Sequence, residues 1–268
     1  MEKEQTLKEK MLSLRDKTNI KLSKDKYIMI MLDGRSFSSL IKKRFKQPFD
    51  DDFIFMMNET AKYLCENISG CKMAYVQSDE ISLIVSCFEN EKSEPFFDYR
   101  INKILSLTAA MATAKFNRLW TQSILHFPCS DSDKNMIFNE LPLATFDCKV
   151  WEIDNYYDAV AWFIFRQNDC IKNSVSQTAQ SLFSHKELEG VDTQGRIDKM
   201  LCEKGINWED FDNGVKYGRF IYKVKVMTKI PQLQQEVERY MWKVHNAFKI
   251  TDNKEKFNEL NLIPKMTL

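Results

Sequence analysis

The feature that most constrains the fold is a pair of short apolar segments separated by only four residues. MAYV at 73–76 and ISLIVSCF at 81–88 flank the polar sequence QSDE at 77–80. Short apolar runs bounded by polar turn residues are typical of strands, and so short a connection is typical of a β-hairpin. The sequence therefore predicts a tight hairpin with its turn at 77–80.

Further elements precede and follow this hairpin. Residues 26–33 form a continuous apolar run, which is the pattern of a strand covered on both faces. Asp50 is the expected N-cap of a helix in which apolar residues recur at helical spacing. A long amphipathic helix is expected over 97–119, and a further strand over 143–153.

The resulting order is β-α-β-β-α-β, so we expect an α+β fold with a ferredoxin-like core. From about residue 156 the chain is expected to be largely helical, with a β-hairpin or strand pair within 216–230. Only 7 Gly and 6 Pro are present, and no repeat or low-complexity linker divides the chain. We therefore expect one compact unit without a flexible joint.

Composition excludes several classes of protein. Hydrophobic residues make up 44% and charged residues 29%, and no apolar run approaches the ~20 residues that a membrane-spanning helix needs. We therefore expect a soluble protein without a membrane partner. The first 20 residues are charged and lack the apolar core of a secretory signal. The seven cysteines contain no C-x-x-C pair, which favours free thiols, and the net charge of +1 requires any nucleic-acid surface to be local.

Two aspartates are candidates for a shared site. In the ferredoxin-like topology the end of the first strand and the turn of the hairpin lie at the same edge of the sheet, so Asp33 and Asp79 are expected to converge. Like charges at short distance are costly, and a divalent cation is the usual compensation. Gly34 would let the ion and a phosphate approach the backbone. Alternatively, Asp33-Gly34 is an ordinary strand-ending turn and Asp79-Glu80 a solvated hairpin tip.

A second candidate site lies at the start of the long helix. Arg100 and Lys103 are three residues apart, so they share one helix face near the positive end of the helix dipole. This pair is suited to a triphosphate. The alternative is an ordinary solvated helix face.

At these residues the chain resembles a known family. LDGRSFSSL, KQPFDDDFIFMMNETAKYL, AYVQSDEISLIV, YRINKILSLTAA, FDCKVW and FRQNDC are similar, in order and spacing, to the tRNA-His guanylyltransferase family and its Thg1-like protein branch. The likeness covers about residues 5–225. A D-G-R-x-F followed by Q-S-D-E at this separation is highly specific for that family.

The resemblance implies a polymerase-palm core in residues 1–150 that adds nucleotides to the 5′ end of tRNA in the 3′-to-5′ direction. It implies that residues 151–268 contact tRNA and form a homotetramer. Two Mg²⁺ ions would be bound by Asp33, Gly34 and Asp79, which with Glu80 in a supporting role would form the catalytic site. ATP and GTP or other NTPs would be substrates. The nucleotide site would comprise Asp33, Gly34, Arg35, Ser36, Phe37, Ser38, Asp50, Ser78 and Asp79.

Polar residues of the second half are candidates for contacts with phosphate and sugar. They are Arg166, Asn168, Lys172, Asn173, Arg196, Lys216 and Arg219. Ile171 and Lys172 stand where the branch devoted to tRNA-His has His-Ile. This departure favours the Thg1-like branch, which repairs truncated tRNA 5′ ends, and the expected location is the cytoplasm, or the mitochondrion in a eukaryote.

Three other functions remain compatible with these residues. The first is a dedicated tRNA-His guanylyltransferase. The second is a nucleotide cyclase of the same palm architecture, which would consume NTP without RNA. The third is an RNA-binding protein without catalysis, although intact Asp33, Asp79 and Glu80 disfavour it because paired carboxylates are costly to keep.

Overall fold

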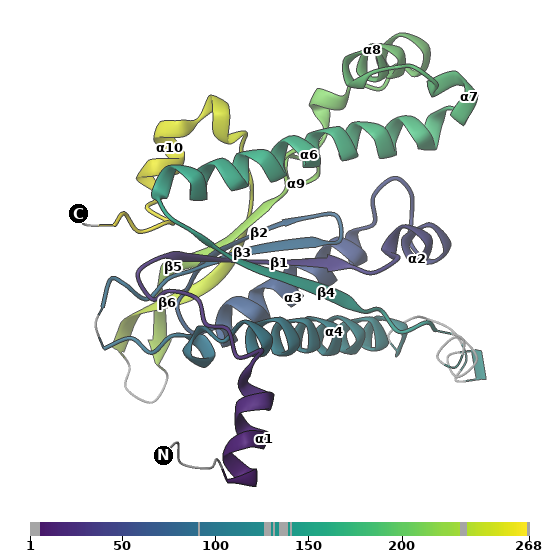
Figure 1. The fold of residues 1–268 in the computed structure, drawn as a ribbon. Helices are drawn as coiled ribbons and strands as arrows, with labels where there is room; N and C mark the ends of the chain where they lie inside the picture. The colour runs from purple at the N-terminus through teal and green to yellow at the C-terminus, as the bar shows by residue number, and fades with distance from the viewer. Residues whose placement is uncertain are drawn as a thin grey trace.

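The computed structural model describes residues 6–90, 92–125, 130, 132–133, 139, 141–230 and 235–266. Six described strands form a single antiparallel sheet in the order β4-β1-β3-β2-β5-β6 (Figure 1). Their bounds are β1 Tyr27–Gly34, β2 Cys71–Gln77, β3 Glu80–Val85, β4 Phe146–Ile153, β5 Arg219–Ile230 and β6 Gln235–Asn246. The hairpin expected around 77–80 is therefore formed by β2 and β3.

Helices cover both faces of the sheet. α3 (Asp51–Asn67) and α4 (Ile101–Leu125) lie on one face, and α6 (Tyr156–Leu182) and α10 (Lys254–Glu259) lie on the other (Figure 1). Because successive side chains of a strand point to opposite faces, β1 contributes to both cores. Ile28, Ile30 and Leu32 pack toward α3 and α4, whereas Tyr27 and Met29 pack toward α6.

The helix starts follow local chemistry. The Asp50 side chain accepts a hydrogen bond from the backbone N–H of Phe53 at 2.9 Å, which caps α3 as expected. α4 begins at Ile101 rather than at residue 97, because Phe97, Asp98 and Tyr99 have positive φ angles that an α-helix does not contain.

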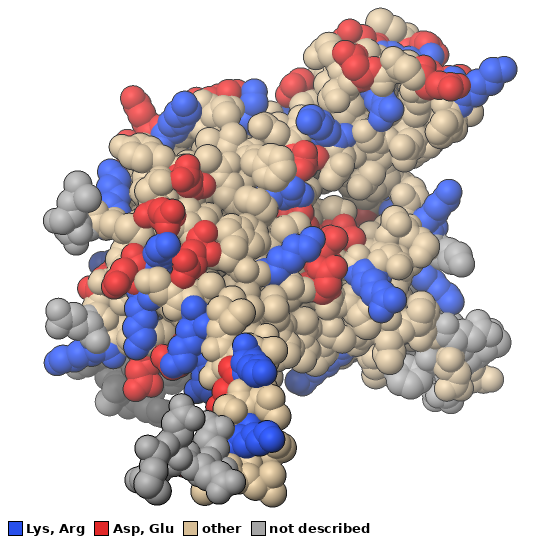
Figure 2. Space-filling model, viewed as in Figure 1, with Lys and Arg blue, Asp and Glu red and all other residues tan. Residues whose placement is uncertain are grey.

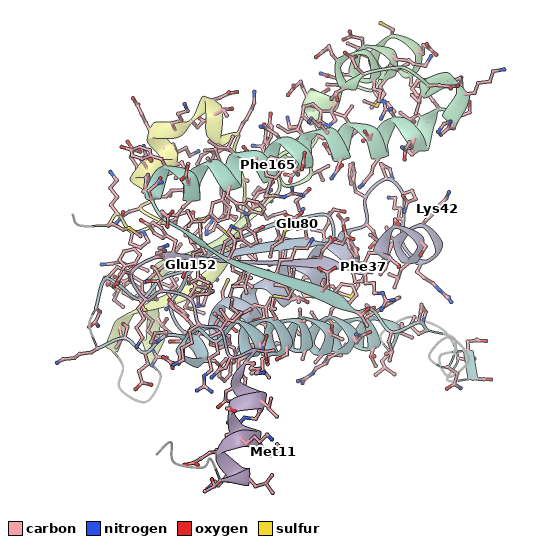
Figure 3. The ribbon with its side chains drawn as sticks, viewed as in Figure 1. Met11, Phe37, Lys42, Glu80, Glu152 and Phe165 are labelled. Carbon is pink, nitrogen blue, oxygen red and sulfur yellow. The ribbon has the colours of Figure 1, made fainter. Side chains whose placement is uncertain are left out.

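Shorter helices complete the described chain. They are α1 Leu7–Asp16, α2 Phe37–Arg44, α7 His185–Leu188, α8 Thr193–Lys204, α9 Asn213–Lys216, and the 3-10 turns η1 Phe96–Tyr99, η2 Trp208–Asp210 and η3 Ile250–Asp252. α1 has no buried residue and projects away from the sheet, with Met11 on it (Figures 1 and 3). In the described part of the chain, no helix is both long and apolar enough to cross a membrane.

The second half contains more β-structure than the sequence indicates. The strand pair expected within 216–230 is instead a single strand, β5, which pairs with β2 on one side and β6 on the other. The sequence did not predict β6, because charged residues such as Glu238, Arg239 and Lys243 interrupt its apolar pattern. As an edge strand it is largely exposed on one side, so it does not need an apolar run.

Candidate active site

The structure brings Asp33 and Asp79 together at one edge of the sheet. Asp33, near the end of β1, lies directly opposite Glu80, the first residue of β3. The backbone N–H of Gly34 donates a hydrogen bond to the carbonyl oxygen of Asp79 at 3.1 Å, which joins the strand end to the hairpin turn. Burial, together with the nearby Asp33 carboxylate, raises the pKa of Asp79 to about 6.

A third carboxylate, which the sequence did not single out, lies beside this pair. Asp147 on β4 is directly opposite Asp33, on the side away from Glu80. Burial is the main cause of a raised pKa at Asp33, and the Asp147 carboxylate raises it further. The sequence predicts the strand over 143–153 but not its register against β1. Only that register shows that Asp147 lies next to Asp33.

Glu80, on β3, faces α6, the helix that carries Phe165 and Arg166 (Figure 3). Its carboxylate accepts hydrogen bonds from both Nε and Nη2 of Arg166, the first at 2.7 Å. Burial keeps the pKa of Glu80 above its ordinary value, whereas the hydrogen bonds from Arg166 lower it. Glu80 is thus paired inside the protein with Arg166, whose contact with tRNA stays a prediction.

Gly34 and Phe37 have a packing role in addition to the roles expected from the sequence. A Cβ atom built at Gly34 would lie 2.4 Å from Cγ of Phe37, so the glycine makes room for this aromatic ring. Phe37 is buried against Phe53, Phe116 and Phe146 (Figure 3). The side chain of Phe37 therefore belongs to the core, and only its backbone can face a nucleotide.

The segment after β1 turns into α2 with free backbone donors. Ser36 has φ 59°, and its side chain makes no capping hydrogen bond, so the first N–H groups of α2 lack that partner. The side chains of Arg35, Ser36 and Ser38 are exposed. A helix N-terminus with free N–H groups suits a phosphate.

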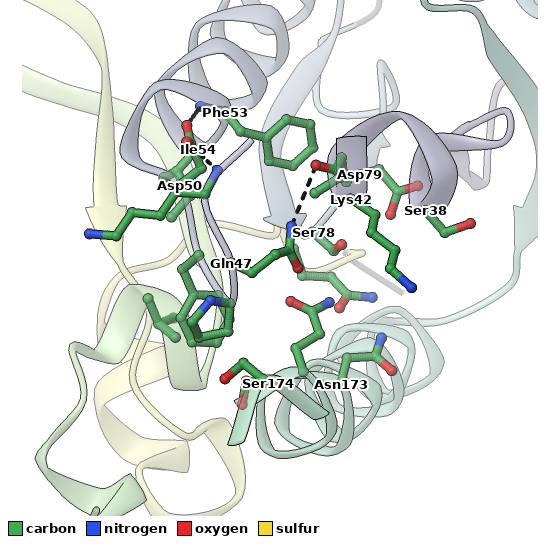
Figure 4. A pocket seen from close by; sticks show the side chains of 18 of the residues that line it. Ser38, Lys42, Gln47, Asp50, Phe53, Ile54, Ser78, Asp79, Asn173 and Ser174 are labelled. Atoms are coloured by element: carbon green, nitrogen blue, oxygen red, sulfur yellow. Dashed lines mark hydrogen bonds between the residues drawn. The ribbon is translucent and has the colours of Figure 1, made fainter. Parts of the chain in front are cut away.

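A cavity of about 520 Å³ adjoins Asp79 (Figure 4). Three segments supply its polar lining: the α2–α3 region with Ser38 and Asp50, the hairpin turn with Ser78 and Asp79, and α6 with Asn173. Asp50 accepts hydrogen bonds from the backbone N–H groups of Lys46, at 2.8 Å, and Phe53, so it also shapes the loop that forms one wall. The volume suits a small-molecule ligand.

Arg100 and Lys103 do not join this cavity. The backbone of residues 99–101 is hydrogen-bonded to residues 20–22, which precede β1, whereas Asp33 is near the other end of that strand. Because β1 rises about 3.3 Å per residue, this separation is on the order of 20 Å. Both side chains are exposed, and within one chain they lie at the end of the sheet away from Asp79. Their binding of a triphosphate stays a prediction.

The remaining candidates for tRNA contact divide into buried and exposed residues. Lys216 is 6% exposed and donates to the carbonyl and carboxylate oxygens of Glu209, and Arg219 is 5% exposed and donates to Asn58 and Gly214. Both are thus held inside the protein, although Nη2 of Arg219 has no partner among the described residues and Arg219 lines the cavity beside Asp79. Contact of either residue with tRNA stays a prediction. Asn168, Lys172 and Asn173 are exposed on α6, and Arg196 is partly exposed, with hydrogen bonds to Val191 and Ser176. Figure 2 shows acidic side chains in the hollow beneath α6, with basic side chains around it.

The donor set fits magnesium. Among the residues that the structure describes, no group of three or more His, Cys, Asp or Glu side chains is arranged to hold a metal ion. Mg²⁺ needs fewer protein ligands, since it binds one or two carboxylates, keeps several waters and takes the rest of its ligands from phosphates. Asp33 and Asp79, with their pKa values raised by burial and by neighbouring carboxylates, are a pair that such an ion would stabilise.

Comparison with known proteins identifies the family. The model of the family described as tRNAHis guanylyltransferase matches residues 9–154, more than half of the chain. The chain belongs to this family. Guanylyltransferases are nucleotidyltransferases, so the chain is classed with enzymes that transfer nucleotides.

Solved structures of this family share the fold. A bacterial tRNA(His) guanylyltransferase (Thg1)-like protein in complex with ATP has a TM-score of 0.79 and 30% identity, covering 95% of this chain and 98% of that one. A bacterial tRNA(His) guanylyltransferase (Thg1)-like protein in complex with GTP has a TM-score of 0.76 and 28% identity, again covering 95% of this chain and 98% of that one. An uncharacterized protein of Acanthamoeba polyphaga mimivirus is 27% identical over 231 residues, which is 79% of this chain and 75% of that protein.

Proposed function

We propose that the protein adds nucleotides to the 5′ end of tRNA in the 3′-to-5′ direction, with the opposite strand as template. The observation that carries this proposal is the convergence of Asp33 and Asp79 beside a cavity of about 520 Å³. The strand order β4-β1-β3-β2 and the helices of the first half support a ferredoxin-like core of the polymerase-palm type. Catalysis is assigned to residues 1–150, and tRNA contact and assembly as a homotetramer to 151–268, although both parts share one sheet.

The chain's own residues have defined tasks in this reaction. Asp33, Asp79 and the carbonyl of Gly34 would hold two Mg²⁺ ions, which activate a 3′-hydroxyl and neutralise the leaving phosphates. The free N–H groups at the start of α2, with Arg35 and Ser36 beside them, bind phosphate oxygens. Ser38, Asp50 and Ser78 line the cavity that receives the rest of the nucleotide.

The substrates follow from the same site. ATP would transfer AMP to a tRNA 5′-phosphate with release of pyrophosphate. The 3′-hydroxyl of GTP or another NTP would then attack that 5′-phosphorus and release AMP. Binding of ATP and GTP by Thg1-like proteins of the same fold supports both roles for the cavity. Because the reacting groups are positioned and their charges neutralised, the protein needs no covalent intermediate of its own.

Repair of truncated tRNA is favoured over dedicated addition of one guanosine to tRNA-His. Ile171 and Lys172 stand at the two positions where the dedicated branch has His-Ile. Ile171 packs into the apolar cluster between α6 and α8, and Lys172 is exposed. The identity to a bacterial Thg1-like protein supports the same choice. The expected location remains the cytoplasm, or the mitochondrion in a eukaryote.

One assay tests this proposal. The protein is incubated with Mg²⁺, NTPs and a panel of tRNAs that lack their first 5′ nucleotide, and the products are resolved by length. We expect extended tRNA from the wild type, and a loss of at least about 100-fold for Asp33→Asn and Asp79→Asn in chains that still fold. Extension of tRNA-His alone would favour the dedicated guanylyltransferase, and cyclic nucleotide without any extended RNA would contradict the proposal.

A further inference from the structure

Both oxygens of the Glu80 carboxylate are fully used in hydrogen bonds within the protein. Oε1 accepts from Nε of Arg166 at 2.7 Å and from Oγ of Ser82 at 3.4 Å. Oε2 accepts from Nη2 of Arg166 and from Nε2 of Gln77 at 3.3 Å. An ionised carboxylate offers about four lone-pair sites, so four donors leave none for a metal ion. Glu80 is also only 5% exposed.

Arg166 is itself held in place on α6. Its Nη1 donates to Asp169 at 2.8 Å, and its guanidinium lies 5.0 Å from the ring centroid of Phe165 and 5.8 Å from that of Trp162. The Arg166 side chain is 13% exposed. A planar guanidinium presents its donors in a rigid fork that matches a carboxylate, so this fixed group sets the position of Glu80.

The position of Glu80 matters because of its neighbours. Glu80 directly follows Asp79 in the chain and lies directly opposite Asp33 in the sheet. A free carboxylate at this place would be a third acidic ligand beside the two aspartates. Arg166 neutralises it and connects α6 to the strand that carries the hairpin turn.

We propose that Arg166 is a positioning residue that keeps Glu80 out of the metal site, so that two side-chain carboxylates, Asp33 and Asp79, bind the divalent cations. This inference rests on the function proposed above and gives a specific form to the supporting role expected of Glu80. It predicts that Glu80 acts through its pairing with Arg166 and does not act as a metal ligand.

Mn²⁺ is a suitable probe because its binding can be measured by calorimetry without tRNA or nucleotide. We expect Glu80→Gln to bind Mn²⁺ within about threefold of the wild type, whereas Asp79→Asn loses at least about tenfold. Arg166→Met frees the Glu80 carboxylate, so we expect Mn²⁺ to bind about tenfold tighter. The double variant Glu80→Gln/Arg166→Met has no carboxylate at position 80 to release, so its Mn²⁺ affinity should return to within about threefold of the wild type.

A matched control changes only Asp169, the partly exposed partner of Arg166. Asp169→Asn leaves both bonds to Glu80 in place, so Mn²⁺ affinity should stay within about threefold of the wild type. If Arg166→Met does not fold, Arg166→Lys takes its place, because a single ammonium cannot satisfy both carboxylate oxygens. Arg166→Lys should then also bind Mn²⁺ more tightly than the wild type, by a smaller factor than Arg166→Met.

The outcomes separate this inference from the proposed function. Loss of Mn²⁺ binding in Glu80→Gln, or equal affinities in the folded single and double Arg166 variants, would overturn the role of Arg166. In tRNA extension, Arg166→Met should lower kcat by at least about tenfold while the half-saturating Mn²⁺ concentration falls; a merely structural defect would not tighten metal binding. A wild type that binds Mn²⁺ through Asp79 but extends no tRNA would contradict the proposed function and leave this inference standing.

Discussion

Asp147 on β4 and Asp33 on β1 lie directly opposite each other, and Glu80 on β3 flanks Asp33 on the other side. Three carboxylates therefore form a row across three strands at the edge of the sheet. Among the residues that the structure describes, Glu80 alone of the three has a basic partner at hydrogen-bonding distance, namely Arg166. Like charges on directly opposed residues destabilise a sheet, so this row has a measurable effect on stability.

We expect Asp147→Asn to increase the free energy of unfolding by roughly 0.2–1 kcal/mol in the absence of divalent cations. The gain should shrink when Mg²⁺ is added, because the cation already compensates the repulsion in the wild type. Urea unfolding with and without Mg²⁺ measures both effects. Asp154→Asn is the control: Asp154 follows the same strand but pairs with Lys26, so its loss should not stabilise the chain.

The raised pKa of Asp79 gives the stability a defined pH dependence. The pKa is about 6 in the folded chain, against an ordinary value of 3.8. Between these values the folded chain keeps a proton that the unfolded chain releases, so the contribution of Asp79 to stability is present in full below about pH 4 and is lost as the pH rises through 6.

Asp79→Asn removes this titration and serves as the measurement. In metal-free buffer, the Tm of the variant minus that of the wild type should be near zero at low pH and rise by roughly 2–6 °C toward pH 7. Using the difference cancels all other titrating groups. A difference that stays constant from pH 4 to pH 7 would show that Asp79 is not perturbed by its surroundings.

The close contact between Gly34 and Phe37 predicts a specific sensitivity. Gly34→Ala places a methyl group 2.4 Å from the Phe37 ring, and overpacking of this kind costs roughly 1–3 kcal/mol. Phe37→Leu in the same chain should recover part of the loss because the smaller side chain leaves room for the methyl group. Chemical denaturation gives the values.

Gly195→Ala is a matched control for that substitution. Gly195 lies in helix α8, and a Cβ there would meet only side-chain atoms of Val191 and Asp192, at 3.0 and 3.1 Å. Alanine is a better helix former than glycine, so this variant should be no less stable than the wild type. Equal losses at Gly34 and Gly195 would contradict the packing role of Phe37.

Exposed and buried basic residues should differ in RNA binding. Lys172 is exposed on α6, so Lys172→Glu should weaken tRNA binding by about tenfold and reduce its salt dependence by roughly one charge. Lys216→Met removes a buried ammonium that is paired with Glu209, and should lower stability without changing tRNA affinity or its salt dependence in the folded fraction. Filter binding at several salt concentrations distinguishes the two.

The parts of the site that follow from local pattern were predictable. The apolar run before Asp33 and the four-residue gap before residue 81 place the strand end and the hairpin turn, and the β-α-β-β-α-β order brings them to one edge of the sheet. Asp50 at the start of α3 follows from capping chemistry alone.

The parts of the site that depend on packing between residues far apart in the sequence could not be predicted. The ion pair of Arg166 and Glu80 joins residues 86 positions apart, and its partners become clear only when α6 lies across the sheet. Phe37 was expected near a nucleotide, yet its ring is enclosed by side chains from three other elements. No local pattern distinguishes such a buried residue from an exposed one beside it.

The pairing of β2 with β5 has a consequence for the independence of the two halves. A chain cut near residue 150 would end within β4 and leave β2 with an unpaired edge of backbone donors and acceptors, which invites association with other strands. The strands that carry Asp33 and Asp79 and the segment from residue 219 onward are thus joined by one hydrogen-bonded sheet. The half that contains Asp33 and Asp79 therefore needs β5 to cover its sheet, so we expect a fragment without the second half to be insoluble.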